Sequence, residues 1–321
     1  MTTFKREGII VTGATGYIGS SLTMRLKKQF SERFDIIALS SKNDLRVTTT
    51  FDFFKSLSDT IEVKYIFHLA ASVRGGEWLA KNPAKAWYDN TLINANIFEI
   101  VRLYFPKAKI ISTLSYSIYA PSEFTRRETE ISFQTSEDNL SAYANSKIAI
   151  IAAQDAYSSQ YNLECCSVVL PTVYGPSCSS KIEDTAQAVN VICKKFINAV
   201  KLSAPQVHLW GNGKQERDLL FIDDAIDGII CSALHQHSSL VNIGTGNVTT
   251  IGKLANILAS LTGYNGKIVF DENEYQGPQR RSLNIQKAKE ELYWQPKTQL
   301  KDGLRAIVNT IKKFHAIAQT K

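Results

Sequence analysis

Two side chains that can move a proton lie four residues apart in the stretch SAYANSK, Ser141 to Lys147. If this stretch begins a helix, Tyr143 and Lys147 share one face, with Cβ atoms roughly 5–6 Å apart. A free tyrosine has a pKa of about 10, and a nearby ammonium stabilises the phenolate, so we expect Lys147 to lower the pKa of Tyr143. Such a phenol is a candidate general acid or base. The alternative is a surface tyrosine beside a solvated lysine, because this spacing also arises by chance.

A glycine-rich turn stands near the start of the chain, in VTGATGYIG, with glycines at 13, 16 and 19. It follows an apolar run and opens a helical pattern. Glycines there permit a tight turn and a close approach of the backbone to a ligand, and the helix N-terminus favours a pyrophosphate. The context predicts a dinucleotide-binding site.

The residues after the second apolar run bear on the type of dinucleotide. An acidic side chain at this place usually binds a free adenosine ribose. Here the chain reads ALSSKND, so Ser40, Ser41 and Lys42 take the position. Two hydroxyls and a cation suit a 2′-phosphate better than a diol, which favours NADP over NAD, whereas Asp44 argues for NAD.

Ser115, in STLSYSIYAP, lies just beyond the apolar run Ala108 to Ser112. Ligands of parallel α/β sheets bind at the carboxyl edge of the strands, where Ser115 is expected to lie. Its hydroxyl can orient a substrate carbonyl while Tyr143 transfers the proton and Lys147 holds the nicotinamide ribose. The three residues together predict hydride-transfer chemistry. The alternative for Ser115 alone is a turn or cap hydroxyl.

The elements that must position these residues alternate along the first half of the chain. Amphipathic helical patterns, such as Tyr17 to Gln29 and Ala84 to Tyr104, separate the apolar runs. Continuous apolar strands alternating with helices indicate a parallel sheet covered on both faces, so the predicted fold class is α/β, a Rossmann-type doubly wound sheet. The expected strands are Gly8 to Gly13, Asp35 to Leu39, Tyr65 to Ala71, Ala108 to Ser112 and Cys165 to Leu170.

The pattern loosens after Pro171. We interpret residues 1–170 as the cofactor-binding domain and residues 171–321 as a smaller substrate-binding lobe, with the segment of about 215–245 returning to the first domain. The lobe is expected to contain helices near Asp184 to Lys201, Phe221 to Leu234, Ile251 to Leu261 and Leu300 to Phe314, and strands at QVHLW and LVNIG, with KIVF between the last two helices.

Composition limits the class of protein. The 321 residues include 44% apolar and 21% charged residues, which is typical of a globular protein. There is no apolar run long enough to span a membrane and no leader peptide, which predicts a cytoplasmic protein without a membrane partner. The net charge of +7 is spread along the chain, so nucleic acid is not an expected partner. The five histidines are scattered and the cysteines lack ligand spacing, so no metal is expected, and the run CCSVVL predicts buried thiols at Cys165 and Cys166.

The chain resembles an extended short-chain dehydrogenase/reductase of the nucleotide-sugar branch, and within it the GDP-L-fucose synthases. Motifs shared with that branch include GATGYIG, YDNTLINANI, YANSK, PTVYGP and VNIGTG. The more specific ones are VRGG within FHLAASVRGG, the Trp-Gly-x-Gly-x-x-x-Arg pattern of WGNGKQERDLLFIDDA, and GYNGKIVFD. LSYSIYAP and YWQPKTQLKDGL complete a similarity that runs nearly end to end.

The resemblance implies roles for particular residues. Ser115, Tyr143 and Lys147 match the catalytic triad, the implied reductant is NADPH, and the implied substrate is a GDP-linked 4-keto-6-deoxy-hexose. Forked guanidinium groups at Arg217 and Arg280 suit a pyrophosphate; the alternative for Arg217 is a surface ion pair with Asp218. A homodimer through helices near Ala84 to Tyr104 and Tyr143 to Gln160 is also implied.

The implied contacts fall in two sets. The cofactor-binding set is Gly13, Thr15, Gly16, Tyr17, Ile18, Gly19, Ser40, Ser41, Lys42, Asp44, Leu45, Leu69, Ala70, Ala71, Asn90, Tyr143, Lys147 and Pro171. The substrate-binding set is Val73, Arg74, Ser117, Thr172, Gln187, Lys195, Trp210, Arg217 and Arg280.

The departures from that family concern epimerisation. Fucose synthases carry a cysteine two residues beyond the catalytic serine and a histidine after the Tyr-Gly-Pro motif; Ser117 and Gln187 take these places. Neither residue is a base able to remove a carbon-bound proton. Thr172 replaces an asparagine usual before Tyr-Gly-Pro, which leaves the nucleotide base open. Dehydratases carry an Asp-Glu pair where this chain has Tyr116 and Ser117, which argues against dehydration.

These observations predict an NADPH-dependent 4-ketoreductase of a nucleotide-activated 4-keto-6-deoxy sugar, for surface-glycan or deoxysugar biosynthesis. Three alternatives stay open: a fucose-synthase-type epimerase/reductase, a nucleotide-sugar 4-epimerase, and a non-catalytic NADP-binding sensor.

Overall fold

The computed structural model describes residues 5–73, 75–131, 141–176, 188–235, 240–274 and 277–319. Two predicted substrate-binding residues, Arg74 and Gln187, lie outside the described residues, as does Cys178.

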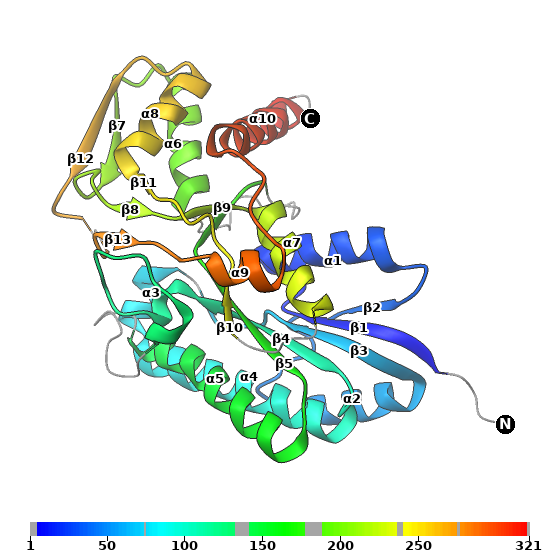
Figure 1. Ribbon diagram of the computed structural model, residues 1–321. Coiled ribbons are helices and arrows are strands. Elements are labelled where there is room, and N and C mark those ends of the chain that lie inside the picture. Colours follow the sequence, from blue (N-terminus) through cyan, green and yellow to red (C-terminus); the bar gives the residue numbers. More distant parts are fainter. Residues whose placement is uncertain are drawn as a thin grey trace.

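The centre of the molecule is a six-stranded parallel sheet with the order β10-β5-β4-β3-β1-β2 (Figure 1). Its strands form where apolar residues run continuously, because both faces of the sheet are covered. The order changes direction between β1 and β3, which is where ligands bind in such sheets. The strands are β1 (Arg6–Thr12), β2 (Asp35–Ala38), β3 (Ile61–His68), β4 (Lys109–Ser115), β5 (Cys165–Leu170) and β10 (Leu240–Asn242).

Helices cover the two faces of the sheet. On one face, α1 (Tyr17–Phe30) packs beside α7 (Ile222–Leu234); on the other, α4 (Pro83–Tyr104) lies between α2 (Thr49–Thr60) and α5 (Ser141–Tyr161) (Figure 1). Each face has its own buried apolar cluster, represented by Leu22 on the first face and Phe98 on the second. The predicted doubly wound α/β fold is confirmed.

A smaller group of elements sits above the α1 and α7 side of the sheet (Figure 1). Its β-structure comprises three small sheets, β7 with β12, β6 with β9, and β11-β8-β13. The apolar cluster of the first face continues into this group, so both parts share one core. Its elements are β6 (Thr172–Tyr174), α6 (Ala188–Lys201), β7 (Gln206–Trp210), β8 (Glu216–Arg217), β9 (Leu219–Phe221), β11 (Thr249–Thr250), α8 (Ile251–Thr262), β12 (Lys267–Asp271), β13 (Arg280–Arg281) and α10 (Leu300–Gln319).

Short elements complete the fold: α3 (Gly76–Lys81), α9 (Gln286–Glu291) and the 3₁₀ turns η1 (Tyr116–Ile118) and η2 (Glu128–Glu130). Several strands differ from their predicted bounds, and β3 and β4 differ the most. β3 begins four residues earlier, at Ile61, and β4 extends to Ser115. The extension of β4 follows from its pairing with β5, in which Ser115 is opposite Leu170. Ser115 is therefore the last residue of the strand rather than a loop residue beyond it.

Candidate active site

A pocket of about 370 Å³ opens at the carboxyl edge of the sheet, between the ends of β1, β2 and β3. The glycine turn forms its floor. Gly13 has φ of +65°, and a Cβ there would lie 2.8 Å from the backbone nitrogen of Ala70, so only glycine fits. A Cβ on Gly19 would collide with the carbonyl oxygen of Gly13. With Gly16 at the N-cap of α1, this cradle and the helix N-terminus fit a dinucleotide pyrophosphate.

Most of the predicted cofactor-binding residues line this pocket. They are Gly13, Thr15, Gly16, Ser40, Ser41, Asp44, Leu45, Leu69, Ala70 and Ala71. Val73, which we had assigned to substrate, lines the same pocket. Lys42 is not among the lining residues, and the cationic side chain of the lining is Arg46.

A chain of buried hydrogen bonds supports the floor of the pocket. His68 lies between Thr12 and Asn94, with Nδ1 3.0 Å from Thr12 Oγ1 and Nε2 3.1 Å from Asn94 Oδ1. Asn94 Nδ2 donates to the carbonyl oxygen of Ser146, 2.8 Å away, which fixes the amide orientation. Nε2 of His68 must then carry the hydrogen, and Nδ1 accepts from Thr12. The chain thus joins β1 and β3 to the helix that carries Tyr143.

Burial keeps His68 neutral. Burial, reinforced by the charge of Lys147, lowers the pKa of His68 to about 3. Thr12 Oγ1 also accepts the N–H groups of Leu69 and Ala70, each at 3.1 Å, so the loop after β3 is held to the end of β1.

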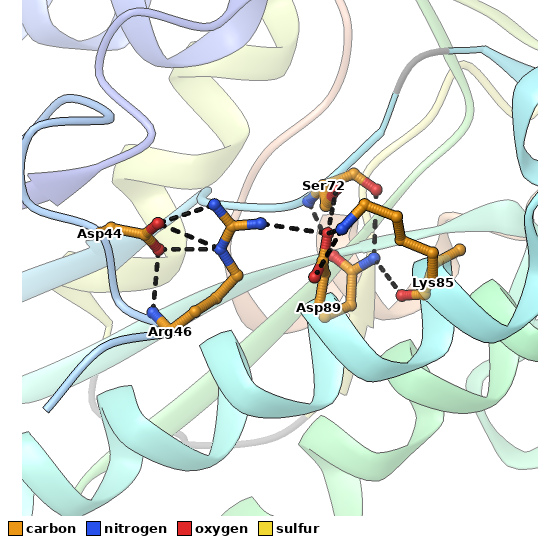
Figure 2. A network of polar contacts seen from close by, with 7 residues as sticks. Asp44, Arg46, Ser72, Lys85 and Asp89 are labelled. Atoms are coloured by element: carbon orange, nitrogen blue, oxygen red, sulfur yellow. Dashed lines mark hydrogen bonds and ion pairs between the residues drawn. The ribbon is translucent and has the colours of Figure 1, made fainter.

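A second polar network lies along the side of the pocket, and Figure 2 shows its members. Asn90, a predicted cofactor-side residue, binds the backbone of Ser72 in both directions, accepting at 2.9 Å and donating at 3.1 Å. The neighbouring Asp89 accepts from Ser72, Arg46 and Lys85. Both α4 residues therefore hold the loop that follows β3.

The three predicted catalytic residues come from two adjacent elements. Ser115 ends β4, and Tyr143 lies in the first turn of α5, which packs against β4 and η1. The ammonium of Lys147 donates to the carbonyl oxygen of Thr113 at 3.1 Å, two residues before Ser115. Lys147 is buried, with 3% of its surface exposed, which excludes the alternative of a solvated lysine.

The expected effect of Lys147 on Tyr143 is not what the structure shows. Burial raises the pKa of the Tyr143 phenol above its usual value, and burial lowers the pKa of Lys147 to about 8. The expectation that the ammonium lowers the phenol pKa is therefore wrong for this conformation, because Lys147 is directed to Thr113 and desolvation dominates both groups. A protonated phenol is suited to give a proton rather than to take one.

The hydroxyl of Ser115 accepts the N–H of Ser117 at 3.3 Å. This bond uses an oxygen lone pair and leaves the hydroxyl proton to donate. Ser117 itself lies in η1 and is buried, and its Oγ has no hydrogen-bond partner in the described part of the chain. Buried polar atoms are normally paired, so Ser117 Oγ is a polar group left for a ligand.

The predicted substrate-binding residues in the second half of the chain contact neighbouring protein groups. Lys195 of α6 donates to the carbonyl oxygen of His208 at 2.8 Å and lies 6.0 Å above the ring of Trp210, which is half exposed. Thr172 begins β6, where its N–H donates to the carbonyl oxygen of Asp218.

Arg217 and Arg280 lie on neighbouring strands of the β11-β8-β13 sheet. Arg280 forms an ion pair with Glu216, and its Nε is buried without a partner among the described residues. Asp218, which we had considered as a surface ion-pair partner of Arg217, is buried. Its carboxylate accepts the N–H and hydroxyl of Thr245, at 3.0 and 2.7 Å.

Reasoning from the sequence missed several residues of the pocket. Thr12, Ser72 and Arg46 line it, and His68, Asp89 and Asn94 support it. Two of them could have been identified from the sequence because they are adjacent to predicted site residues: Thr12 precedes Gly13, and Asp89 precedes Asn90. In the described ranges, no group of three His, Cys, Asp or Glu side chains could hold a metal ion. Cys165 and Cys166 are buried thiols, as predicted.

Known proteins resemble the chain over nearly its whole length. GDP-mannose 3,5-epimerase 1 of Oryza sativa subsp. indica is 28% identical over 330 residues, which cover 95% of this chain and 82% of that protein. GDP-L-fucose synthase of Escherichia coli (strain K12) is 27% identical over 316 residues, covering 93% and 94%. The structure of GDP-mannoheptose C4 reductase from Campylobacter jejuni, with NADP bound, has a TM-score of 0.80 at 22% identity and covers 97% of this chain and 100% of that one.

The described helices include none that is long and apolar enough to cross a membrane. Residues 9–244 match the family model described as the NAD dependent epimerase/dehydratase family, which is more than half of the chain. The glycine cradle, the pocket and the fold agree with that match. The chain therefore belongs to the NAD dependent epimerase/dehydratase family of extended short-chain dehydrogenases/reductases and is an NAD(P)-dependent oxidoreductase.

Proposed function

We propose that the protein is an NADPH-dependent 4-ketoreductase of a GDP-linked 4-keto-6-deoxy sugar. The observation that carries the proposal is the position of Lys147, whose bond to Thr113 holds α5 against β4 beside Ser115. Several relatives have names that mention GDP-sugars, which supports GDP as the nucleotide of the substrate. The pocket at the carboxyl edge of the sheet supports the proposal, because it is lined by the glycine turn that suits a dinucleotide.

The residues divide the work of reduction. NADPH, when bound, supplies a hydride to the C4 carbonyl carbon. The Ser115 hydroxyl, already accepting from the Ser117 N–H, donates to the carbonyl oxygen and stabilises the negative charge that develops there. Tyr143 gives its phenolic proton to that oxygen, and burial keeps the phenol protonated until then. Lys147, with its pKa lowered to about 8, still carries its charge at neutral pH and is the residue that we assign to hold the nicotinamide ribose.

The preference for NADPH over NADH rests on the lining of the pocket. Ser40 and Ser41 line the pocket after β2 and offer hydroxyl donors. Arg46 adds a guanidinium to the same lining, and guanidinium groups suit phosphate oxygens. Asp44, which argued for NAD in the sequence, is bound by Arg46 through both carboxylate oxygens.

A second candidate, a GDP-sugar 3,5-epimerase, is favoured by the similarity to GDP-mannose 3,5-epimerase 1. An epimerase would need a general base that removes a carbon-bound proton from the sugar. Ser117 occupies the cysteine position of fucose synthases, and its buried hydroxyl has no hydrogen-bonded base beside it in the described residues. A hydroxyl without a base does not remove a carbon-bound proton at neutral pH, which is why we place reduction first.

The proposal is tested by following NADPH absorbance with purified protein and 4-keto-6-deoxy sugars linked to GDP, UDP or dTDP. We expect NADPH oxidation with the GDP-linked sugar and at least about tenfold slower turnover with the others. Cofactor binding without turnover of any of them would contradict a reductase and favour a sensor. A homodimer through α4 and α5 remains a prediction; exposed Trp87 and Tyr88 on α4 are apolar groups that such an interface would cover.

A further inference from the structure

The carbonyl oxygen of Gly175 accepts hydrogen bonds from two side chains that are distant from each other in sequence. Tyr17 donates its phenolic hydroxyl at 2.9 Å, and Asn190 donates an Nδ2 hydrogen at 3.0 Å. Gly175 directly follows β6 and has φ of +149°, and a Cβ there would lie 2.5 Å from Ile222 Cγ2 at the start of α7. The backbone of Gly175 therefore packs too closely on α7 for a side chain, which holds the carbonyl in place.

Tyr17 joins this carbonyl to the cofactor cradle. It is the first residue of α1 and follows Gly16, which is the N-cap of the helix and lines the pocket. Because Gly16 has no side chain, it cannot cap the N–H groups of the first turn, and a bound pyrophosphate suits them. A ligand on these N–H groups restrains the first turn of α1 and, with it, the position of the Tyr17 ring.

The Asn190 side chain joins the same carbonyl to the substrate side. Asn190 lies in the first turn of α6 and is 5% exposed. Its Oδ1 is buried without a partner among the described residues, so the bond to Gly175 is the polar contact that the structure gives this amide. The same helix carries Lys195, a predicted substrate-binding residue, which donates to the carbonyl oxygen of His208. The bond to Gly175 therefore restrains the turn of α6 that precedes Lys195.

Both donors depend on one acceptor, so the position of each side chain constrains the other. A shift of α1 that moves the Tyr17 hydroxyl away leaves the carbonyl to Asn190 alone, and a shift of α6 leaves it to Tyr17 alone. One hydrogen bond between neutral groups changes an equilibrium by about two- to tenfold. This is the size of the effect that the shared acceptor can transmit between the two helices.

We propose that Tyr17 and Asn190 are positioning residues that share the Gly175 carbonyl, so that binding of the dinucleotide at the start of α1 stabilises the start of α6 and strengthens binding of the nucleotide sugar. Because linkage is reciprocal, the nucleotide sugar strengthens dinucleotide binding by the same factor. The second effect rests on the proposed function, since Lys195 belongs to the proposed nucleotide-sugar site. The first effect concerns the protein and its cofactor alone.

The test combines two readouts on wild type, Y17F, N190L and the double variant. Calorimetric titration gives the dissociation constant of GDP with and without NADP⁺ at a concentration that saturates each protein. Hydrogen exchange of peptides within residues 188–201 is measured with and without NADP⁺, in the absence of GDP. In wild type we expect NADP⁺ to tighten GDP binding about fivefold and to slow exchange in α6 at least about threefold. In each single variant both ratios should fall below about twofold, and the double variant should lose no more, because both side chains act through one carbonyl.

Y264F is the matched control. Tyr264 also donates its hydroxyl to a backbone carbonyl, that of Lys267 at 3.4 Å, and its ring packs edge-on against Phe196 of α6. This bond lies within the substrate-side group of elements, so Y264F should keep both NADP⁺ ratios within about twofold of wild type. Each single variant at position 17 or 190 leaves the Gly175 carbonyl one donor, so we expect both to fold. If N190L does not unfold cooperatively, N190A replaces it, and wild-type ratios there count against the proposal.

Several results would overturn the proposal. Wild-type protein in which NADP⁺ leaves exchange in α6 unchanged would contradict it, as would Y17F or N190L protein that keeps the wild-type ratios. Loss of the ratios in Y264F as well would show that any loosening around α6 has the same result, and would rule out a special role of the shared carbonyl. A wild-type protein that does not bind GDP in either condition would defeat the proposed function, and the exchange ratios would then decide the inference by themselves.

Discussion

The two sides of the cleft differ in how the chain treats its own buried polar atoms. On the cofactor side, Thr12, His68 and Asn90 have their side chains engaged by neighbouring protein groups. On the substrate side, Ser117 Oγ and Arg280 Nε are buried without a partner in the part of the chain that the structure describes. Buried polar atoms are costly when unpaired. The comparison teaches that the chain satisfies the polar groups of the cofactor pocket by itself, whereas on the other side, in our proposal, the substrate supplies the missing partners.

The largest expected effect comes where the two sides meet. Y143F removes the proton donor, so we expect kcat to fall by about 10³-fold, within the range for loss of a general acid. The dissociation constant of NADPH should change little, because the pocket lining contains glycine-turn and loop residues rather than Tyr143. Single-turnover NADPH oxidation measures the first quantity and fluorescence titration the second. A Y143F variant that still reduces substrate at a tenth of the wild-type rate would contradict the assigned role.

The next effect concerns the cofactor side. G13A places a Cβ at a residue with φ of +65°, 2.8 Å from the Ala70 nitrogen, and we expect at least about tenfold weaker dinucleotide binding. G263A is the matched control: φ there is +80°, but a Cβ meets nothing within 4 Å. It should lose stability and keep cofactor affinity. Equal losses of affinity in both variants would show that backbone strain alone, and not the cradle, governs binding.

The hydrogen-bond chain through His68 predicts a pH dependence of stability. Burial lowers the pKa of His68 to about 3, so the folded protein keeps it neutral while the unfolded chain binds a proton below about pH 6.5. The free energy of unfolding should therefore fall as pH falls through this window, by about 1.4 kcal/mol per pH unit from this residue.

Urea unfolding at several pH values measures this slope. H68Q should reduce the slope of the free energy of unfolding against pH by about 1.4 kcal/mol per pH unit. H208Q changes a histidine at an exposed position of β7 and should leave the slope unchanged. A slope that is the same in wild type and H68Q would mean that another group titrates, and the neutral assignment of His68 would be wrong.

The smallest effect is expected at Ser117. Because its hydroxyl is unpaired within the described chain, S117A should leave stability nearly unchanged and raise the KM for the nucleotide sugar by about two- to tenfold, the worth of one hydrogen bond. Steady-state kinetics and thermal unfolding check both points. A loss of kcat beyond about a hundredfold would place Ser117 in the chemistry and revive the epimerase alternative.

Much of the fold follows from local patterns. The apolar runs of β1 and β5 and the glycine turn predict strand, helix and pocket floor, because each is determined by residues adjacent in sequence. The triad residues were also predicted in this way; their roles stay a prediction, and the structure places the Lys147 ammonium on the carbonyl of Thr113 in β4. The domain division at residue 170 stays a prediction.

The remaining features depend on residues distant in sequence. Asp89 meets Arg46 across 43 positions and His68 meets Thr12 across 56, and no local spacing announces either contact. The predicted direction of the Tyr143 pKa shift was wrong for the same reason. Proximity on a helix face predicts that Lys147 acts on Tyr143, but the depth of burial and the carbonyl of Thr113 are set by tertiary packing.

The most direct test of the central claim is an NMR time course with GDP-4-keto-6-deoxy-mannose, NADPH and enzyme in deuterated water. It follows cofactor oxidation and the appearance of deuterium at C3 and C5 of the sugar. We predict reduction at C4 with no solvent deuterium at C3 or C5, because no base is hydrogen-bonded to the Ser117 hydroxyl among the described residues. Deuterium at both carbons, with an L-configured product, would contradict the account and identify a bifunctional epimerase/reductase.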